Sequence, residues 1–258
     1  MEYPYNDIFN FPDRILLNKR ITKSFFTKNF DLTTTEKKLL NKNVQHIEWF
    51  ASIKPSNANI SEVKNEEYIF EEIQVIICTI PTNQLNVISN KCIDLLQKYI
   101  PYQLVVIVED EYDFIVNTCD KRVNFNNTAK RVVTNCLMST TISKLFKNDI
   151  TSSFFKALDF SQLDKTNMQT TYDSYTQALV EFQTALITGK FKKRNHLRTE
   201  KDMIILVAIE EVEKEITGLK SKLKKEIQLN IKVELNIEIQ KRRNKIKELK
   251  NKLSTDEH

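Results

Sequence analysis

Glycine is almost missing from this chain, which contains only Gly189 and Gly218 among its 258 residues. Phosphate-cradling loops, dinucleotide-binding fingerprints and nucleophile elbows each need at least two glycines within a short window, because the backbone must turn sharply or approach a ligand closely. The two glycines lie far apart in the sequence. The sequence therefore excludes the common nucleotide-binding loops and the nucleophile turn of α/β-hydrolases.

Histidine is scarce and cysteine is dispersed. The three histidines, at positions 46, 196 and 258, form neither an HExxH motif nor a zinc-finger pattern, which argues against a histidine-based metal site. His46 has no identifiable orienting partner and is expected to be structural rather than catalytic. The four cysteines contain no CxxC pair: Cys78, Cys92, Cys119 and Cys136. Because they lie within apolar stretches, we expect reduced thiols packed as small hydrophobic groups.

Long hydrophobic runs are also missing. No stretch of about 18 consecutive apolar residues is present, and the N-terminal residues do not show the basic and then apolar pattern of a signal peptide. Hydrophobic residues nevertheless make up 41% of the chain, which is enough for one sizeable folded domain and an additional element. We therefore expect a folded cytoplasmic protein without a membrane partner.

Positive charge, in contrast, is concentrated near the C-terminus. Residues 214–252 include 13 Lys or Arg and 5 Glu, a net charge of +8, whereas the whole chain carries +5. The remainder is therefore close to −3. This asymmetry predicts a long basic projection, which suits contact with a partner protein or a nucleic acid better than enclosure of a small substrate.

Two apolar seams predict that residues 198–258 form a basic antiparallel helical hairpin. The first seam contains Ile209, Val212, Ile216, Leu219 and Leu223, and the second contains Leu235, Ile239, Arg242, Ile246, Leu249 and Leu253. Both repeat at spacings of three and four residues. Every second residue from 227 to 239 is apolar, which is also compatible with a strand. A continuous coiled-coil helix that forms a homo-oligomer is the main alternative to the hairpin.

The rest of the chain predicts an α/β (α+β) core with a mixed sheet. Residues 1–30 form an aromatic and basic arm, whose phenylalanines we expect to pack on the core; stacking on single-stranded nucleic acid is the alternative. Residues 31–150 form the core and residues 151–197 a connector and a helix. Expected core helices are 33–43 and 82–99, and expected strands are 47–51, 73–80, 104–108, 114–116 and 131–141. Residues 120–128 are expected to be a polar loop, and the acidic turn at 109–113 a solvated hairpin tip.

Five tracts resemble an uncharacterised prokaryotic family called domain of unknown function 4391. The tracts are NKRITKSFF at 18–26, IEWFASIKPSNANI at 47–60, EEIQVI at 71–76, YIPYQLVVIVE at 99–109 and KEIQLNIKVELNIE at 225–238. Proteins similar to this family tend to be encoded near helicases and DNA methyltransferases of restriction-type systems. The resemblance therefore implies an accessory role in anti-phage defence, by association rather than by mechanism.

The order of the core elements also suggests a restriction-nuclease-like fold. The metal site of that superfamily needs an Asp, followed on the next strand by Asp/Glu-x-Lys, to bind Mg²⁺ and activate water. Here Glu72 begins the corresponding strand, but Gln74 replaces the lysine, and no Asp lies upstream, where only Glu62 could supply a second carboxylate. The nuclease alternative, in which Glu72 and Gln74 form the site, therefore predicts a degenerate enzyme that needs Mg²⁺ only if it is active. The structural interpretation is that Glu71 and Glu72 end a buried strand.

The sequence favours an interaction subunit without a cofactor over an enzyme. Its expected partner is a helicase or methyltransferase of the same defence system, with DNA or RNA as a further ligand. The candidate residues for contact with phosphates or an acidic partner are basic side chains of the predicted hairpin: Lys222, Lys225, Lys241, Arg242, Arg243 and Lys247.

Overall fold

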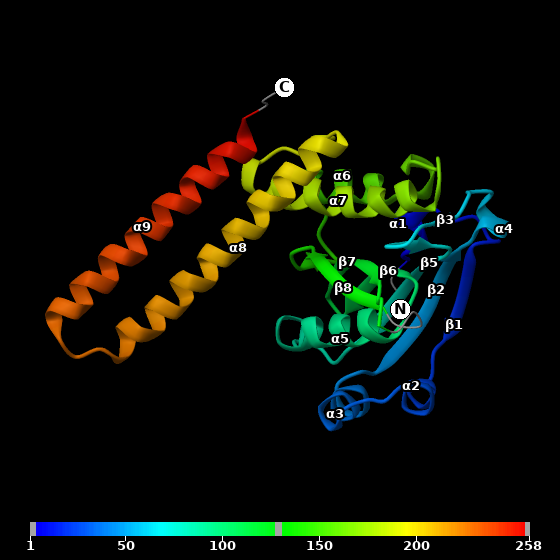
Figure 1. Cartoon of the computed structure of the whole chain (residues 1–258), viewed down its shortest axis with the longest axis horizontal. Helices are drawn as coiled ribbons and strands as arrows, with labels where there is room; N and C mark the ends of the chain where they lie inside the picture. The colour runs from blue at the N-terminus through cyan, green and yellow to red at the C-terminus, as the bar shows by residue number, and fades with distance from the viewer. Residues whose placement is uncertain (1–3, 127–130, 256–258) are drawn as a thin grey trace. The chain divides into compact units, whose positions relative to one another are not determined.

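A computed structural model describes residues 4–126 and 131–255, and the chain divides into two compact units, residues 1–179 and 180–258 (Figure 1). The first unit is an α+β domain built on a mixed sheet, and the second consists of helices. The predicted fold class is therefore confirmed, including the helical region at the C-terminal end of the chain.

The main sheet has seven strands in the order β1-β2-β5-β6-β7-β8, with β9 paired to β7. The strands are β1 (Leu16–Arg20), β2 (His46–Ile53), β5 (Ile73–Thr79), β6 (Gln103–Glu109), β7 (Asp113–Val123), β8 (Arg131–Met138) and β9 (Ile142–Ser143). Only β5 and β6 pair in parallel, and the other pairs are antiparallel. The short strands β3 (Val63–Lys64) and β4 (Ile69–Phe70) form a separate hairpin.

Helices precede, connect and follow these strands. In the first unit they are α1 (Asn6–Phe9), α2 (Lys23–Asn29), α3 (Thr34–Lys42), α4 (Pro55–Ala58), α5 (Leu85–Tyr99), α6 (Asp149–Leu158) and the 3₁₀ helix η1 (Phe160–Gln162). The boundary between the two units falls within α7 (Met168–Thr188). The second unit continues with α8 (His196–Lys225) and α9 (Leu229–Ser254).

Helix α3 begins where the sequence predicts, because Thr33 caps it. The Thr33 hydroxyl accepts the Glu36 N–H, and the Glu36 carboxylate accepts the Thr33 N–H in return. Lys98 and the Tyr99 hydroxyl also donate to this carboxylate, at 2.8 and 2.9 Å. Partial burial by itself would raise the pKa of Glu36, but these hydrogen bonds outweigh it and lower the pKa to about 2.

One hydrophobic cluster of the first unit lies where α5, α2 and α3 cover one face of the sheet. Helix α5 buries Leu85, Ile88, Cys92 and Leu95, which recur at spacings of three and four, as the sequence predicts. The parallel strands β5 and β6 are buried along almost their whole length, which explains their nearly continuous Ile and Val content.

The aromatic segment near the N-terminus contributes to the fold rather than presenting a stacking surface. Phe9, Phe11 and Phe26 are at most 3% exposed, and the rings of Phe9 and Phe11 stack with centroids 5.3 Å apart. Strand β1 of the same segment pairs with β2. Among the described phenylalanines of this segment, Phe25 is largely exposed, at 44%. The prediction that these phenylalanines pack on the core is thus confirmed for the buried three and for Phe30, which is partly buried and packs against the same cluster as Phe26.

Strand β7 is longer than the sequence suggests. The expected loop at 120–128 was wrong at its start, because Asp120, Lys121 and Arg122 continue β7 and pair with Thr134, Val133 and Val132 of β8. Polar residues conceal the strand in the sequence. Residues 127–130 of the expected loop lie outside the described residues.

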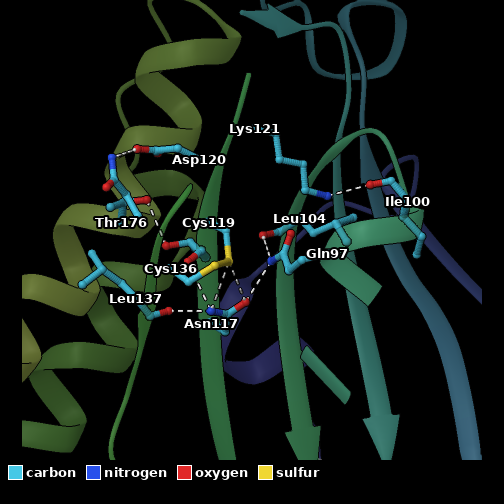
Figure 2. Close-up of a disulfide and its surroundings, with 12 residues drawn as sticks. Gln97, Ile100, Leu104, Asn117, Cys119, Asp120, Lys121, Cys136, Leu137 and Thr176 are labelled. Atoms are coloured by element: carbon cyan, nitrogen blue, oxygen red, sulfur yellow. Dashed lines mark hydrogen bonds between the residues drawn. A yellow bond between two sulfur atoms is a disulfide. The ribbon is translucent and has the colours of Figure 1, made fainter. Parts of the chain in front are cut away.

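Two of the four cysteines form a disulfide, which corrects the expectation of four reduced thiols. Figure 2 shows the bond between Cys119 of β7 and Cys136 of β8, with an S–S distance of 2.11 Å. The two residues are 17 positions apart, and antiparallel pairing brings their Cα atoms to 4.1 Å. This proximity depends on the register of β7 against β8, and the sequence contains no CxxC motif that would have predicted the pairing. Cys78 and Cys92 are free and buried, as expected.

A buried lysine on β7 ties the α5–β6 connection to the sheet. The Lys121 ammonium is fully buried and donates to the carbonyl oxygens of Ile100 and Tyr102, at 2.6 and 2.7 Å (Figure 2 shows the first contact). Burial lowers the pKa of Lys121 well below its ordinary value. Its role is structural, because both acceptors are backbone groups.

Candidate functional site

The basic C-terminal region forms a helical hairpin. Helices α8 and α9 are joined by only three residues, 226–228, and pack along each other (Figure 1). Val212, Ile216 and Ile239 form the buried centre of their contact, and Leu219, Leu223 and Ile246 pack against it. The two predicted seams therefore meet each other. Of the alternating apolar residues from 227 to 239, Ile227 lies in the turn and the others lie on α9 and not on a strand, and their helical spacing turns some of them outward.

An ionic cluster closes the open end of the hairpin. The Asp202 side chain on α8 is completely buried, and its two oxygens lie 2.8 Å from Arg198 Nε and 3.3 Å from Arg194 Nε. The same guanidinium groups donate to the carbonyl oxygens of Lys252 and Leu253 at the end of α9. Burial raises the pKa of Asp202, and the two guanidinium groups oppose that shift. The cluster thus joins the start of α8 to the end of α9.

A second ion-pair network fixes the register of the two helices at mid-length. Arg242 of α9 lies 3.1 Å from Glu215 of α8 and also pairs with Glu238 on its own helix. Lys241 pairs with Glu238 as well, at 3.0 Å. Both basic residues are candidates from the sequence, but the structure engages their charges within the hairpin. Arg242 is the less exposed of the two.

The other four candidate cations point into solvent. Lys222, Lys225, Arg243 and Lys247 are exposed, and the structure gives none of them an ion pair within the described residues. An exposed cation without a carboxylate partner can bind phosphate or an acidic side chain without first breaking an internal pair. The hairpin therefore carries some cations in internal ion pairs, such as Lys241 and Arg242, and others that are free to bind a ligand.

The second candidate site surrounds Glu72, immediately before β5. The Glu72 carboxylate is buried and accepts hydrogen bonds from the Ser52 hydroxyl at 2.7 Å and the Gln74 amide at 2.9 Å. Lys54 Nζ lies 3.5 Å from its other oxygen. The register of β2 against β5 places Ser52 opposite Gln74, which brings these groups together. Sequence reasoning identified Glu72 and Gln74 but missed Ser52 and Lys54, because only strand pairing makes them neighbours.

The chemistry of this second site does not match a two-carboxylate Mg²⁺ centre. The described residues contain no group of three or more His, Cys, Asp or Glu side chains placed to hold a metal. Glu62 and Glu71 both pair with Lys64, at 3.1 and 3.2 Å, rather than with Glu72. Gln74 supplies a neutral amide where the nuclease motif has a lysine. Glu72 thus has the contacts of a structural carboxylate paired with one cation.

The acidic turn between β6 and β7 is also structural, and its expected solvation was wrong for Asp110. This side chain is only 4% exposed and accepts the backbone N–H groups of Asn83, Tyr112 and Asp113. The neighbouring Glu109 accepts hydrogen bonds from Tyr5, Thr79 and Lys144. Donors of the protein itself, including the Lys144 ammonium, therefore satisfy the carboxylates of Asp110 and Glu109.

Together, the fold and the charge distribution define an α+β protein whose chain continues into a basic helical hairpin. The sequence model of a family described as Domain of unknown function (DUF4391) matches residues 9–246 of 258. The chain therefore belongs to this family. No curated protein and no solved structure matches it. No helix within residues 4–126 and 131–255 is long and apolar enough to cross a membrane.

Proposed function

We propose that this protein is an accessory interaction subunit of a prokaryotic DNA-directed defence system. Its α8–α9 hairpin would hold a partner protein, such as a helicase or methyltransferase of that system, and would also contact nucleic acid. The observation that carries the proposal is the set of exposed, unpaired cations on the hairpin: Lys222, Lys225, Arg243 and Lys247. Internal ion pairs keep the helices in register while these charges remain available to a ligand.

The nucleic-acid part of the proposal is tested by removing these four charges together. Binding of labelled DNA and RNA duplexes and single strands is measured by fluorescence anisotropy at several salt concentrations. The variant with all four residues changed to Gln should bind more weakly across all sequences. For duplex DNA the slope of log affinity against log salt should fall by about 3 to 4, because each phosphate contact contributes about 0.9.

A matched control removes two cations that are already engaged on the same helices. Lys214 pairs with Glu210 at 2.6 Å and Lys241 pairs with Glu238. The variant Lys214→Gln/Lys241→Gln should retain most of the affinity. Equal affinities of the wild-type protein and the fourfold variant would refute nucleic-acid binding through the hairpin.

The protein-partner part is tested by co-purification from the native genetic neighbourhood. Tagged full-length protein and the fourfold variant are purified in parallel after nuclease treatment, and the eluates are compared by quantitative mass spectrometry. Enrichment of a helicase or methyltransferase with the wild-type chain, reduced in the variant, is expected. Recovery of the same neighbours with both proteins would place the contact elsewhere on the chain.

The metal-dependent nuclease remains the second candidate, with Glu72 and Gln74 at its site. It is supported by the parallel β5–β6 pair joined by α5, together with Lys54 beside the Glu72 carboxylate. Cleavage that requires Mg²⁺ or Mn²⁺ and disappears in a folded Glu72→Gln variant would favour this function. Because the neighbouring carboxylates pair with Lys64, we expect no such cleavage.

A further inference from the structure

The Cys119–Cys136 disulfide lies at the edge of the main sheet. Cys119 belongs to β7, which lies between β6 and β8, and Cys136 belongs to β8, the last strand in the order. Within the described residues, β8 pairs with β7 alone. Cys119 is only 1% exposed, whereas Cys136 is an exposed residue. The bond therefore joins a buried cysteine to one that solvent reaches.

The backbone pairing of β7 with β8 is irregular at the same place. The register sets Cys119 alone opposite two residues of β8, Asn135 and Cys136. Asn135 has a φ of 46°, the left-handed conformation that such a β-bulge uses. A bulge leaves the extra residue unpaired and locally disrupts the hydrogen-bond ladder. The disulfide thus connects the two strands where their regular backbone pairing is interrupted.

Fixed polar groups hold the buried half of the bond. The Tyr172 hydroxyl of α7 accepts the Cys119 N–H at 3.0 Å and donates to the Cys119 carbonyl oxygen at 2.8 Å. The side-chain amide of Asn117 donates to Cys119 Sγ at 3.6 Å (Figure 2). Hydrogen bonds to Gln97 and to the Leu137 carbonyl oxygen fix the orientation of this amide. Cys119 is therefore held in place with an N–H donor directed at its sulfur.

We propose that Cys136 is a redox-reactive site, at which a dithiol reductant of the thioredoxin class opens the disulfide and releases the edge strand β8. The attack falls on Cys136 because a thiolate must reach the sulfur that it attacks, and Cys119 is closed off from solvent. Exposed disulfides are the labile and regulatory ones, whereas structural disulfides resist reduction. This inference concerns the first unit and does not depend on the function proposed for the hairpin.

The reaction is a thiol–disulfide exchange in two steps. In the first step, a thiolate of the reductant bonds to Cys136 Sγ, and the electron pair of the broken S–S bond leaves on Cys119. The Asn117 N–H stabilises this thiolate until it takes a proton from solvent. In the second step, the other thiol of the reductant loses its proton and attacks the mixed disulfide, and Cys136 leaves as a thiolate that is then protonated. Two electrons pass from the reductant, which becomes a disulfide, to the protein, which gains two thiols.

Little else holds β8 once the bond is open. Of its eight residues only Leu137 is buried, so the strand contributes few apolar contacts to the core. Segments with few buried contacts and an exposed backbone open at low free energy. The buried strands β5 and β6 lie further inside the sheet. We therefore expect reduction to open β8 locally and to leave β5 and β6 closed.

The first test measures which sulfur reacts in the folded, full-length protein. The wild-type chain is reduced, freed of reductant, labelled briefly with N-ethylmaleimide under native conditions and analysed by peptide mass spectrometry. Cys136 should be labelled at least tenfold faster than Cys119, with the buried Cys78 and Cys92 as internal standards. Equal labelling of Cys119 and Cys136 would overturn the inference. So would rapid labelling of all four cysteines, because the reduced domain would then be unfolded rather than locally open.

The second test follows reduction of the oxidised wild-type protein. The rate should rise in proportion to the concentration of dithiothreitol, because the thiolate attacks the folded protein. A rate that stays constant as the concentration rises would show that unfolding must come first, and the inference would then fail. A thioredoxin whose second active-site cysteine is replaced by serine should be trapped, after acid quenching, as a mixed disulfide with Cys136. Trapping at Cys119 would contradict the assignment.

Hydrogen exchange distinguishes a local switch from a structural cross-link. Reduction should accelerate exchange at least tenfold in residues 131–138 and leave residues 73–79 and 103–109 unchanged. In the matched variant Cys136→Ser the same reductant should change nothing, because the bond is missing. Unchanged exchange in residues 131–138 of the reduced wild type would refute the release of β8. Equal acceleration throughout the first unit would also refute it, because the bond would then stabilise the whole domain.

Discussion

Neutralising Asp202 should destabilise the helical hairpin strongly. Its carboxylate is completely buried between Arg194 and Arg198, whose side chains are only 9% and 12% exposed. The variant Asp202→Asn keeps the shape of the side chain but removes the buried negative charge that both guanidinium groups contact. Removal of one partner from a buried ion pair costs about 3 to 5 kcal/mol. We expect a loss of about 3 kcal/mol, because the carbonyl oxygens of Lys252 and Leu253 still accept hydrogen bonds from the arginines.

Two probes separate the hairpin from the sheet during urea denaturation. Far-UV circular dichroism follows the helices of both units, of which α8 and α9 are the longest, whereas fluorescence of the single tryptophan, Trp49 on β2, follows the first unit alone. In Asp202→Asn the circular dichroism transition should begin at lower urea, and hydrogen exchange of α8 and α9 peptides should accelerate. The tryptophan transition should change much less.

The matched control neutralises an exposed carboxylate on the same helix. Glu200 lies 3.6 Å from His196 with a side chain that is 58% exposed, so Glu200→Gln should change the unfolding free energy by less than about 0.5 kcal/mol. A loss below about 1 kcal/mol in Asp202→Asn, or unchanged hydrogen exchange in α8 and α9, would refute the argument that this cluster closes the hairpin.

Three further predictions concern the stability of both units. Because the folded pKa of Glu36 is lowered to about 2, the stabilisation that its carboxylate provides should be complete above the ordinary value of 4.5 and lost as pH falls from 4.5 towards 2. In urea titrations at pH 7, Glu36→Gln should lower the free energy of unfolding by about 1 to 2 kcal/mol. This difference from the wild type should shrink as pH falls over the same range. Reduction of the Cys119–Cys136 disulfide should cost about 3 kcal/mol, and Cys119→Ser should abolish the effect of dithiothreitol on the melting temperature; four alkylated cysteines in denatured, unreduced protein would contradict the bond. Ile239→Ala should lower the unfolding free energy of the hairpin by about 2 to 4 kcal/mol, because Ile239 is 5% exposed at the centre of its core, and a circular dichroism transition identical to that of the wild type would exclude this role.

Much of the architecture could be predicted because it depends on local periodicity. Apolar residues at spacings of three and four predicted α5 and the two helices of the hairpin, and the dense β-branched residues predicted β5 and β6. Where polar residues dominate, as in the second half of β7, the prediction was wrong at 120–123 because strand pairing overrode a loop-like composition.

The candidate sites were only partly visible from the sequence. Basic residues on the hairpin could be identified from composition. Whether a given residue forms an ion pair, as Arg242 does and Lys222 does not within the described residues, depends on which carboxylates the neighbouring helix places near it. Likewise, Glu72 was identified from a motif, whereas Ser52 and Lys54 reach it only through the pairing of β2 with β5. Contacts between residues far apart in sequence leave no periodic signal.

The sequence by itself determined the α+β class, the absence of glycine-dependent nucleotide loops, the basic helical pair and the membership of a family. Each follows from composition, spacing or similarity along the chain. Only the tertiary structure decided that Cys119 pairs with Cys136, that Lys121 and Asp202 are buried, and that Ile239 rather than Val233 or Ile237 packs against α8. The physical reason is that burial and pairing depend on strand register and helix rotation, and these are set by the packing of distant segments against one another.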